Sequence, residues 1–287
     1  MVKTEPLVSV VVRTHNRAEH LKTALQCLKD QTWPNLEIFL VDHNSSDNTA
    51  EIARSFGDSV KYYLHKGSFR DTFNVWRNQI NGEFVSFLDD DDYITPECIE
   101  KLMDILLTDS NIDIAFSRQR YFSVKSNCCI IEKETPRIDC NNIRKLLIQR
   151  NVVLWNGVVL RRDCLENIPP IDDSITGAFD WYFWILLDLA SYNFFQLDCF
   201  LGYIHRSQDS IQYEIPRMGK GILECIEYYG RHLSIYEKVI NAYYHMYGYR
   251  LICNGIICLE QGDTASGRSQ ILKGIFNYAV GAKKILK

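Results

Sequence analysis

The chain has 287 residues, of which 46% are hydrophobic and 24% are charged, and its formal net charge is −4 at pH 7. This composition is typical of a globular protein with a sizeable core. The negative balance argues against a non-specific nucleic-acid binder, which needs a basic face, so we expect no nucleic-acid partner. The ten cysteines form no CxxC pair, which favours reduced thiols over a zinc site or a disulfide framework.

No signal peptide is visible, and no apolar run approaches the roughly 18 residues that a membrane span needs. The first apolar run is short, rich in valine and ended by Arg13, as expected for a strand. Together with the reduced cysteines, these features predict a cytoplasmic protein.

The first 118 residues alternate predicted strands with predicted helices. Apolar runs predict strands at 7–12, 37–41, 60–64, 84–88 and 112–116. Helical spacing predicts helices at 18–30, 49–56 and 72–79, and Thr95-Pro96-Glu97 predicts another helix start with Thr95 as its N-cap. Near-continuously apolar strands separated by helices indicate an α/β fold with a mostly parallel sheet that helices cover on both faces.

The remaining sequence divides into two parts. Residues 119–212 are less regular and contain three tryptophans, whereas residues 213–287 lack strand signals and are expected to be helical. The sequence therefore predicts three segments, with boundaries at 1–118, 119–212 and 213–287.

Four consecutive aspartates, Asp89 to Asp92, follow the fourth predicted strand. Adjacent carboxylates disfavour one another's ionisation, so either they face water or a positive group lies among them. A solvated loop before a helix N-terminus is the simplest interpretation. A calcium loop fails, because Tyr93 and Ile94 occupy the fifth ligand position and the required glycine. The third interpretation is Mg²⁺ or Mn²⁺ carrying a diphosphate.

Polar residues also follow the first two strands. Ligands of such folds bind outside the carboxyl ends of the strands, where Asp42 and Asp89 are expected to share a crevice. The first loop, Arg13-Thr14-His15-Asn16-Arg17, has no glycine, which excludes a dinucleotide fingerprint and a P-loop. A polar loop opposite Asp42 suits hydrogen bonding to a base.

At this point the sequence resembles the family 2 glycosyltransferases of the GT-A fold. The resemblance rests on VSVVVRTHNRAEHLKTALQCLKDQTWPNLEIFLVDHNSSDNTAEIA, followed by NGEFVSFLDDDD; it is close over residues 6–110 and looser to 212. It implies an inverting transfer from a nucleotide-diphosphate sugar, by default a UDP-sugar, to a hydroxyl of a glycan or glycolipid, in surface polysaccharide biosynthesis. It also implies a Rossmann-like sheet and a divalent metal, Mn²⁺ or Mg²⁺.

The resemblance assigns roles to the three segments and to a nucleotide site. Residues 1–118 would form the nucleotide-sugar-binding half, 119–212 the acceptor-binding half of the same GT-A domain, and 213–287 a helical extension. Asp42 matches the family's base-reading aspartate. Asp91 is implied as the metal ligand of a D-x-D motif, with Asp89 or Asp90 at the ribose. The loop that holds the nucleotide is matched by Thr14, His15, Asn16 and the neighbouring Arg17.

One family feature is altered next to Asn74, which keeps an asparagine position of the family and is a further nucleotide-binding candidate. Phe73 replaces the family's arginine. Arg70 or Arg77 is then expected to supply the charge at the diphosphate.

Inverting transfer needs a base for the acceptor hydroxyl. The segment GAFDWYFWILLDLA at 177–190 resembles the start of the family's aromatic helix, and Asp180 aligns with its catalytic aspartate, although Phe179 replaces the usual glutamate. A helix cap is the alternative role for Asp180. Asp172 and Asp173 are weaker substitutes for the base.

Two further groups are candidates on the resemblance. In LGYIHRSQDSI, His205 is a candidate metal or phosphate ligand and Arg206 a diphosphate contact, with an ordinary paired histidine as the alternative. Trp155 and Asn156 are the acceptor candidates.

The last predicted helix carries Lys283, Lys284 and Lys287 and could rest on an anionic membrane surface, where lipid-linked acceptors are found. Packing against the preceding helices is the favoured alternative.

Two other functions compete with the transferase. A metal-dependent nucleotidyltransferase also pairs a nucleotide pocket with acidic ligands, but it would be expected to carry a glycine-rich, lysine-bearing first loop. A catalytically inactive partner subunit or nucleotide-sugar sensor is suggested by Phe73 and Phe179, and it would bind donor and metal without transfer.

Overall fold

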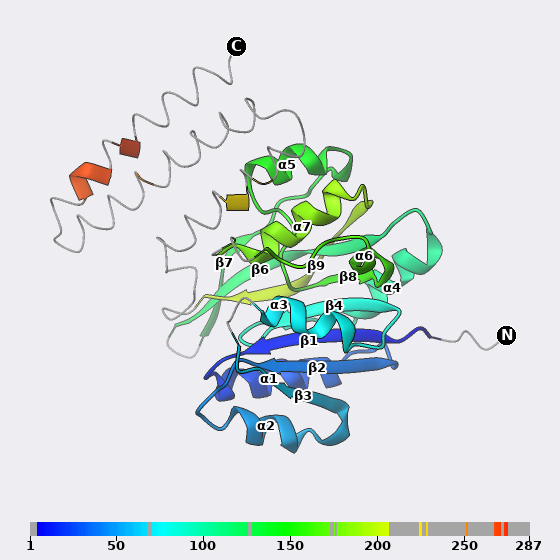
Figure 1. Ribbon diagram of the computed structural model, residues 1–287, viewed down its shortest axis with the longest axis vertical. Coiled ribbons are helices and arrows are strands. Elements are labelled where there is room, and N and C mark those ends of the chain that lie inside the picture. Colours follow the sequence, from blue (N-terminus) through cyan, green and yellow to red (C-terminus); the bar gives the residue numbers. More distant parts are fainter. Residues whose placement is uncertain are drawn as a thin grey trace, which may run out of the picture. The chain divides into compact units, whose positions relative to one another are not determined.

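Figure 1 shows the computed structural model, which describes residues 5–67, 71–125, 128–172, 175 and 177–206, with short pieces at 224–225, 228, 251, 267–270 and 273–274. The chain forms two compact units. The first comprises Met1–Ile143, Val153–Ile171 and Ala190–Gln208, and the second Arg144–Val152, Asp172–Leu189 and Asp209–Lys287. The helical region predicted for 213–287, including the lysines of its last helix, lies almost wholly outside the described residues.

Four parallel strands form one half of the first unit's sheet, in the spatial order β3-β2-β1-β4 (Figure 1). They are β1 (Val8–Thr14), β2 (Leu36–Asp42), β3 (Val60–Leu64) and β4 (Phe84–Asp89). The connections contain α1 (Ala18–Lys29), α2 (Thr49–Ser55), the 3₁₀ turn η1 (Gly57–Ser59), α3 (Thr72–Val75) and the 3₁₀ turn η2 (Trp76–Asn78). The valines of β1 are fully buried because this strand lies between β2 and β4, with α1 packed on one face.

The register of these strands brings their polar ends to one edge. Thr14 pairs with Asp42 across β1 and β2, and Arg13 pairs with Asp89 across β1 and β4. The side chains that follow these strands therefore lie side by side, as the sequence predicted.

The other half of the sheet is mixed. It contains β5 (Tyr93–Ile94), β6 (Ile114–Lys125), β7 (Cys128–Glu134), β8 (Val158–Arg161) and β9 (Phe194–His205). The strand β8 runs antiparallel to both β4 and β6, whereas β9 runs parallel to β6 and pairs with β5 at the edge. The helices of this half are α4 (Cys98–Thr108), η3 (Cys140–Asn142) and α6 (Asp163–Glu166). The α/β fold with a central sheet and flanking helices is confirmed.

Two expectations about elements are wrong. The stretch expected to be less regular, 119–212, contains most of β6 and all of β7, β8 and β9. The helix expected to begin near Thr95 begins at Cys98, so Thr95 is not its N-cap. The reason is tertiary: the Thr95 carbonyl accepts from the Gln31 side chain and the Pro96 carbonyl from the Thr32 amide, which holds this segment outside the helix.

The second unit contains α7 (Phe179–Leu189) and most of α5 (Ile143–Gln149). The Trp181 indole donates to the Leu147 carbonyl at 2.8 Å, and Arg144 bonds the buried Asp188 carboxylate at 2.8 Å. These contacts join the two helices. No helix among the described residues is long and apolar enough to cross a membrane.

Candidate active site

The four aspartates form one tight turn at the end of β4. The Asp92 amide donates to the Asp89 carbonyl at 3.2 Å, which closes the turn and directs the four side chains differently. We call residues 89–92 the acidic turn. Asp89 is the most accessible, with 38% of its side chain exposed, whereas Asp90, Asp91 and Asp92 are largely buried.

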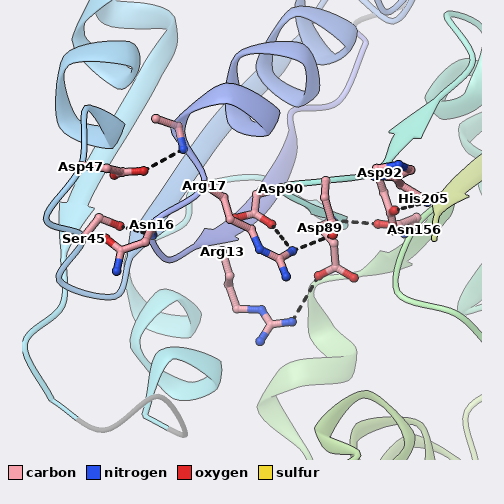
Figure 2. Close-up of polar contacts among 12 residues, drawn as sticks. Arg13, Asn16, Arg17, Ser45, Asp47, Asp89, Asp90, Asp92, Asn156 and His205 are labelled. Atoms are coloured by element: carbon pink, nitrogen blue, oxygen red, sulfur yellow. Dashed lines mark hydrogen bonds and ion pairs between the residues drawn. The ribbon is translucent and has the colours of Figure 1, made fainter. Parts of the chain in front are cut away.

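Two arginines from the end of β1 and the loop after it neutralise the outer part of the acidic turn (Figure 2). Arg13 contacts the Asp89 carboxylate at 3.4 Å, and its guanidinium lies 5.3 Å from the centre of the Trp155 ring. Arg17 Nη1 lies 2.6 Å from Asp91 Oδ2 and 3.3 Å from Asp90 Oδ1. Positive charge is thus supplied by the protein itself.

Asp92 points inward and joins three segments of the chain (Figure 2). One carboxylate oxygen accepts from the Asn156 amide group and the other from the His205 backbone N–H at 2.7 Å. Asn156 also accepts from the Asp89 backbone N–H at 2.8 Å. Burial raises the pKa of Asp92 well above its usual range, and the nearby Asp89 and Asp91 add to this effect.

A pocket of about 220 Å³ lies beside Asp91 and His205. Its wall is lined by His20, Thr23, Asp91, Asp92, Tyr93, Phe122, Val124 and His205. Burial lowers the pKa of His205, His20 adds to the effect and Asp91 opposes it, and the net lowering favours the neutral ring. Neutral imidazole is the form that binds metals.

Asp91 and His205 line the same pocket, and a carboxylate and an imidazole are side chains of the kinds that bind divalent cations. Among the described residues, no three His, Cys, Asp or Glu side chains already form a complete metal site. Mg²⁺ and similar ions are commonly held by one or two carboxylates with substrate phosphates completing the shell. The carboxylate and the imidazole lining this pocket are compatible with that arrangement.

The loop after β1 packs against the loop after β2 (Figure 2). His15 Nδ1 donates to the His43 carbonyl at 2.6 Å, and the Asn16 side chain accepts from the Ser46 backbone N–H at 2.7 Å. Asn16 adopts φ 52°, in the left-handed region that asparagine tolerates better than most residues. Thr14 is buried beside Asp90.

Asp42 is 1% exposed and organises the start of its own loop. One carboxylate oxygen accepts from the Ser45 amide at 2.9 Å and hydroxyl at 2.6 Å, and the other accepts from the Tyr62 hydroxyl at 2.6 Å. The structure thus brings Asp42, the loop after β1 and the acidic turn to the same edge of the sheet.

Asn74 and Arg77, two candidates in and just after α3, form hydrogen bonds with backbone groups. The Asn74 side chain accepts from the Ile171 amide at 2.9 Å and donates to its carbonyl at 3.3 Å. Arg77 donates to the carbonyls of Ile168 and Pro169 at 2.8 and 3.0 Å. Arg70 lies outside the described residues.

Arg206 and Trp155 have partners that do not line the pocket, whereas Asn156 bonds Asp92, which does. Arg206 pairs with Glu132 at 3.4 Å, and its guanidinium lies 5.0 Å from the centre of the Tyr121 ring. Trp155 is 4% exposed and stacks on Phe87, and Asn156 is 2% exposed. Asn156 supports the acidic turn from within, through Asp89 and Asp92, and the acceptor role of the two residues stays a prediction.

Asp180 is the second residue of α7, in the second unit. The Asn151 side chain donates to its Oδ2 at 2.7 Å. Ala178, just before the helix, has φ 52°, and Phe179 is buried.

Sequence reasoning did not find Arg13 and Asp92 as members of this site. Arg13 neutralises Asp89, and Asp92 connects the acidic turn to β9. The signal for Asp92 was available, since a D-x-D motif leaves the fourth aspartate of the run without a role.

Residues 9–155 match the profile of glycosyl transferase family 2. The chain therefore belongs to this family. It is 34% identical over 183 residues to an uncharacterized glycosyltransferase of Rickettsia typhi, covering 62% of this chain and 58% of that protein. It is 35% identical over 135 residues to the GalNAc(5)-diNAcBac-PP-undecaprenol beta-1,3-glucosyltransferase of Campylobacter jejuni, covering 45% and 40%. The chain thus spans little more than half the length of these relatives at most.

Solved structures show the same fold. The S. aureus TarS 1–349 complex with UDP-GlcNAc matches with a TM-score of 0.66 at 16% identity, covering 96% of this chain and 81% of that one. The mannosyltransferase PcManGT of Pyrobaculum calidifontis, with GDP-Man and Mn²⁺, matches with a TM-score of 0.61 at 14% identity, covering 99% and 88%. Identities this low establish the GT-A fold alone.

Proposed function

We propose that this chain is an inverting glycosyltransferase that transfers a sugar from a nucleotide-diphosphate sugar to a hydroxyl of a glycan or lipid-linked acceptor. A UDP-sugar is the default donor. The observation that carries the proposal is the acidic turn at the end of β4, which lies in register with Asp42 and the loop after β1. In open α/β sheets, ligands bind outside the carboxyl ends of the strands, which is where this turn lies.

The donor site combines four parts in this proposal. Asp42 and the loop Thr14-His15-Asn16 hold the nucleotide, with Arg17 and Asn74 beside it. Asp89 or Asp90 faces the ribose. Arg70 and Arg206 are diphosphate candidates. Asp91 and His205 hold a divalent cation, Mn²⁺ or Mg²⁺, which when bound balances the charge developing on the leaving diphosphate.

Asp180 is the proposed base. It takes the proton of the acceptor hydroxyl as the acceptor oxygen bonds to the anomeric carbon and the bond to the diphosphate breaks. Attack opposite the leaving group inverts the configuration of that carbon. The bond from Asn151 fixes one carboxylate oxygen and so orients the carboxylate.

The likeness to a relative whose name specifies an undecaprenol-linked acceptor supports a lipid-linked acceptor here. Synthesis of a surface polysaccharide on such a carrier would place the protein in the cytoplasm, at the inner face of a membrane. The lysine-bearing C-terminal helix is the proposed contact, although it lies outside the described residues.

The test compares donor binding with transfer. In a thermal-shift panel of UDP, GDP, CDP and their sugars, with Mn²⁺ or with EDTA, the true donor should raise the melting temperature only with metal. Asp180→Asn should keep this shift and lower the transfer rate about 10²- to 10⁴-fold, since it removes a general base. Asp104→Asn, at an exposed position of α4, is the matched control.

Other outcomes would contradict the proposal. Full transfer by Asp180→Asn would place the base elsewhere. Donor binding without transfer or donor hydrolysis in the unsubstituted protein would favour the inactive partner or sensor. Release of pyrophosphate from a nucleoside triphosphate and a sugar phosphate would favour the nucleotidyltransferase.

A further inference from the structure

Arg17 has a position that its local helix does not explain. It occupies the N-cap of α1, yet its side chain makes no capping hydrogen bond. Asp47 instead accepts from the Ala18 backbone N–H at 3.0 Å. A positive charge at a helix N-terminus opposes the helix dipole, so the local preference is against arginine here.

The Arg17 guanidinium forms ion pairs with the acidic turn. The same nitrogen, Nη1, reaches Asp91 at 2.6 Å and Asp90 at 3.3 Å, and 24% of the Arg17 side chain is exposed. An arginine side chain is always charged in proteins, so the ion pair neutralises the carboxylate proposed to bind the metal.

We propose that Arg17 is a built-in counter-cation that holds the metal site in a low-affinity state until the donor's diphosphate arrives. This inference rests on the proposed function. In the protein without donor, a divalent cation at Asp91 would lie close to the guanidinium, and like charges repel. The diphosphate removes this conflict in two ways: its negative charge offsets the repulsion, and its oxygens complete the metal shell.

The consequence is coupled binding of metal and donor. If the diphosphate favours the cation at Asp91, then by linkage the cation raises the affinity for the nucleotide by the same factor. Arg17 is thus a positioning residue for the metal and not a ligand of it. Among the described residues, the charged or titratable groups around the same site also include Asp89, Asp92, Tyr93, Arg13, His20 and His205.

The test is Mn²⁺ binding to the full chain without donor, measured from the electron paramagnetic resonance signal of free Mn²⁺. Arg17→Gln should bind Mn²⁺ about tenfold more tightly than the unsubstituted protein, within the usual range of coupling factors. Arg17→Lys keeps the charge and should stay close to the unsubstituted protein. Arg137→Gln, at a side chain that is 78% exposed, is the matched control.

Repeating the titrations with UDP, GDP or CDP completes the design. The nucleotide that binds should raise Mn²⁺ affinity strongly in the unsubstituted protein and less in Arg17→Gln. If Arg17→Gln left both the melting temperature and the Mn²⁺ affinity unchanged, the inference would be overturned, but the proposed function would not. If no nucleotide changed Mn²⁺ binding even in the unsubstituted protein, both the inference and the proposed donor site would fail.

Discussion

At the scale of single residues, each of the adjacent carboxylates of the acidic turn has a partner that offsets its repulsion by the others. Asp89 faces Arg13, Asp90 and Asp91 share Arg17, and Asp92 accepts hydrogen bonds inside the protein. The solvated-loop interpretation explains none of these contacts. In the proposed function, a metal ion and a diphosphate would replace part of the charge balance that the arginines provide.

Asp92→Ala should lower the free energy of unfolding by about 1–3 kcal/mol, because the Asn156 amide and the His205 backbone N–H lose a buried acceptor. It should also weaken Mn²⁺ binding in the presence of nucleotide, since His205 is no longer fixed. Asp92→Asn keeps one acceptor oxygen, so its free energy of unfolding should fall by less. Urea unfolding measures the stability, with Asp104→Ala as control, and an Asp92→Ala protein as stable as that control would contradict this role.

At the scale of elements, the sequence predicted the parallel half of the sheet well, because buried strands are continuous apolar runs and their ends are marked by polar residues. It predicted less of the other half, where β7 and β9 carry exposed apolar and charged residues that obscure the strand pattern. The start of α4 and the partners of the acidic turn were also missed. They depend on contacts such as Thr32 with Pro96 and Arg17 with Asp91, which join residues 64 and 74 positions apart.

The entry into β4 depends on Gly82, which lies against β1. A Cβ at this position would come 2.5 Å from the Ser9 amide nitrogen, a backbone atom that cannot move without shifting β1. Gly82→Ala should therefore lower the free energy of unfolding by about 1–3 kcal/mol, as overpacking usually does. If Ser9→Ala restored the stability of Gly82→Ala, the clash would involve only the serine hydroxyl and the backbone interpretation would be wrong.

At the scale of the whole first unit, the two ends of the parallel strands have different roles. The carboxyl ends hold the candidate site, whereas near the amino ends a buried glutamate joins the strands. Glu37 on β2 accepts from the Ser9 hydroxyl on β1 at 2.5 Å, from the Asn81 backbone and side chain at 2.8 and 2.9 Å, and from Lys61 on β3. Burial alone would raise the pKa of Glu37, but these partners lower it.

This linkage predicts a pH dependence of stability. Because the pKa of Glu37 is lower in the folded protein than the unfolded value of about 4.3, its contribution is present above that value and is lost as pH falls through the folded pKa. Glu37→Gln should lower the free energy of unfolding at pH 7 by about 1–3 kcal/mol. The free energy of unfolding of this variant should also fall less on acidification than that of the unsubstituted protein. Urea unfolding between neutral and acidic pH checks this, with the exposed Glu51→Gln as control; equal acid sensitivity in both variants would contradict it.

The central claim is that the acidic turn binds the donor's diphosphate through a divalent cation held by Asp91 and His205. The most direct measurement is anomalous diffraction from Mn²⁺ in crystals grown with the nucleotide that the thermal-shift panel selects. The account predicts one anomalous peak within about 2–2.5 Å of an Asp91 carboxylate oxygen, in contact with the diphosphate. A nucleotide bound at the strand ends with no Mn²⁺ near Asp91, and with Arg17 still on the Asp90 and Asp91 carboxylates, would contradict it.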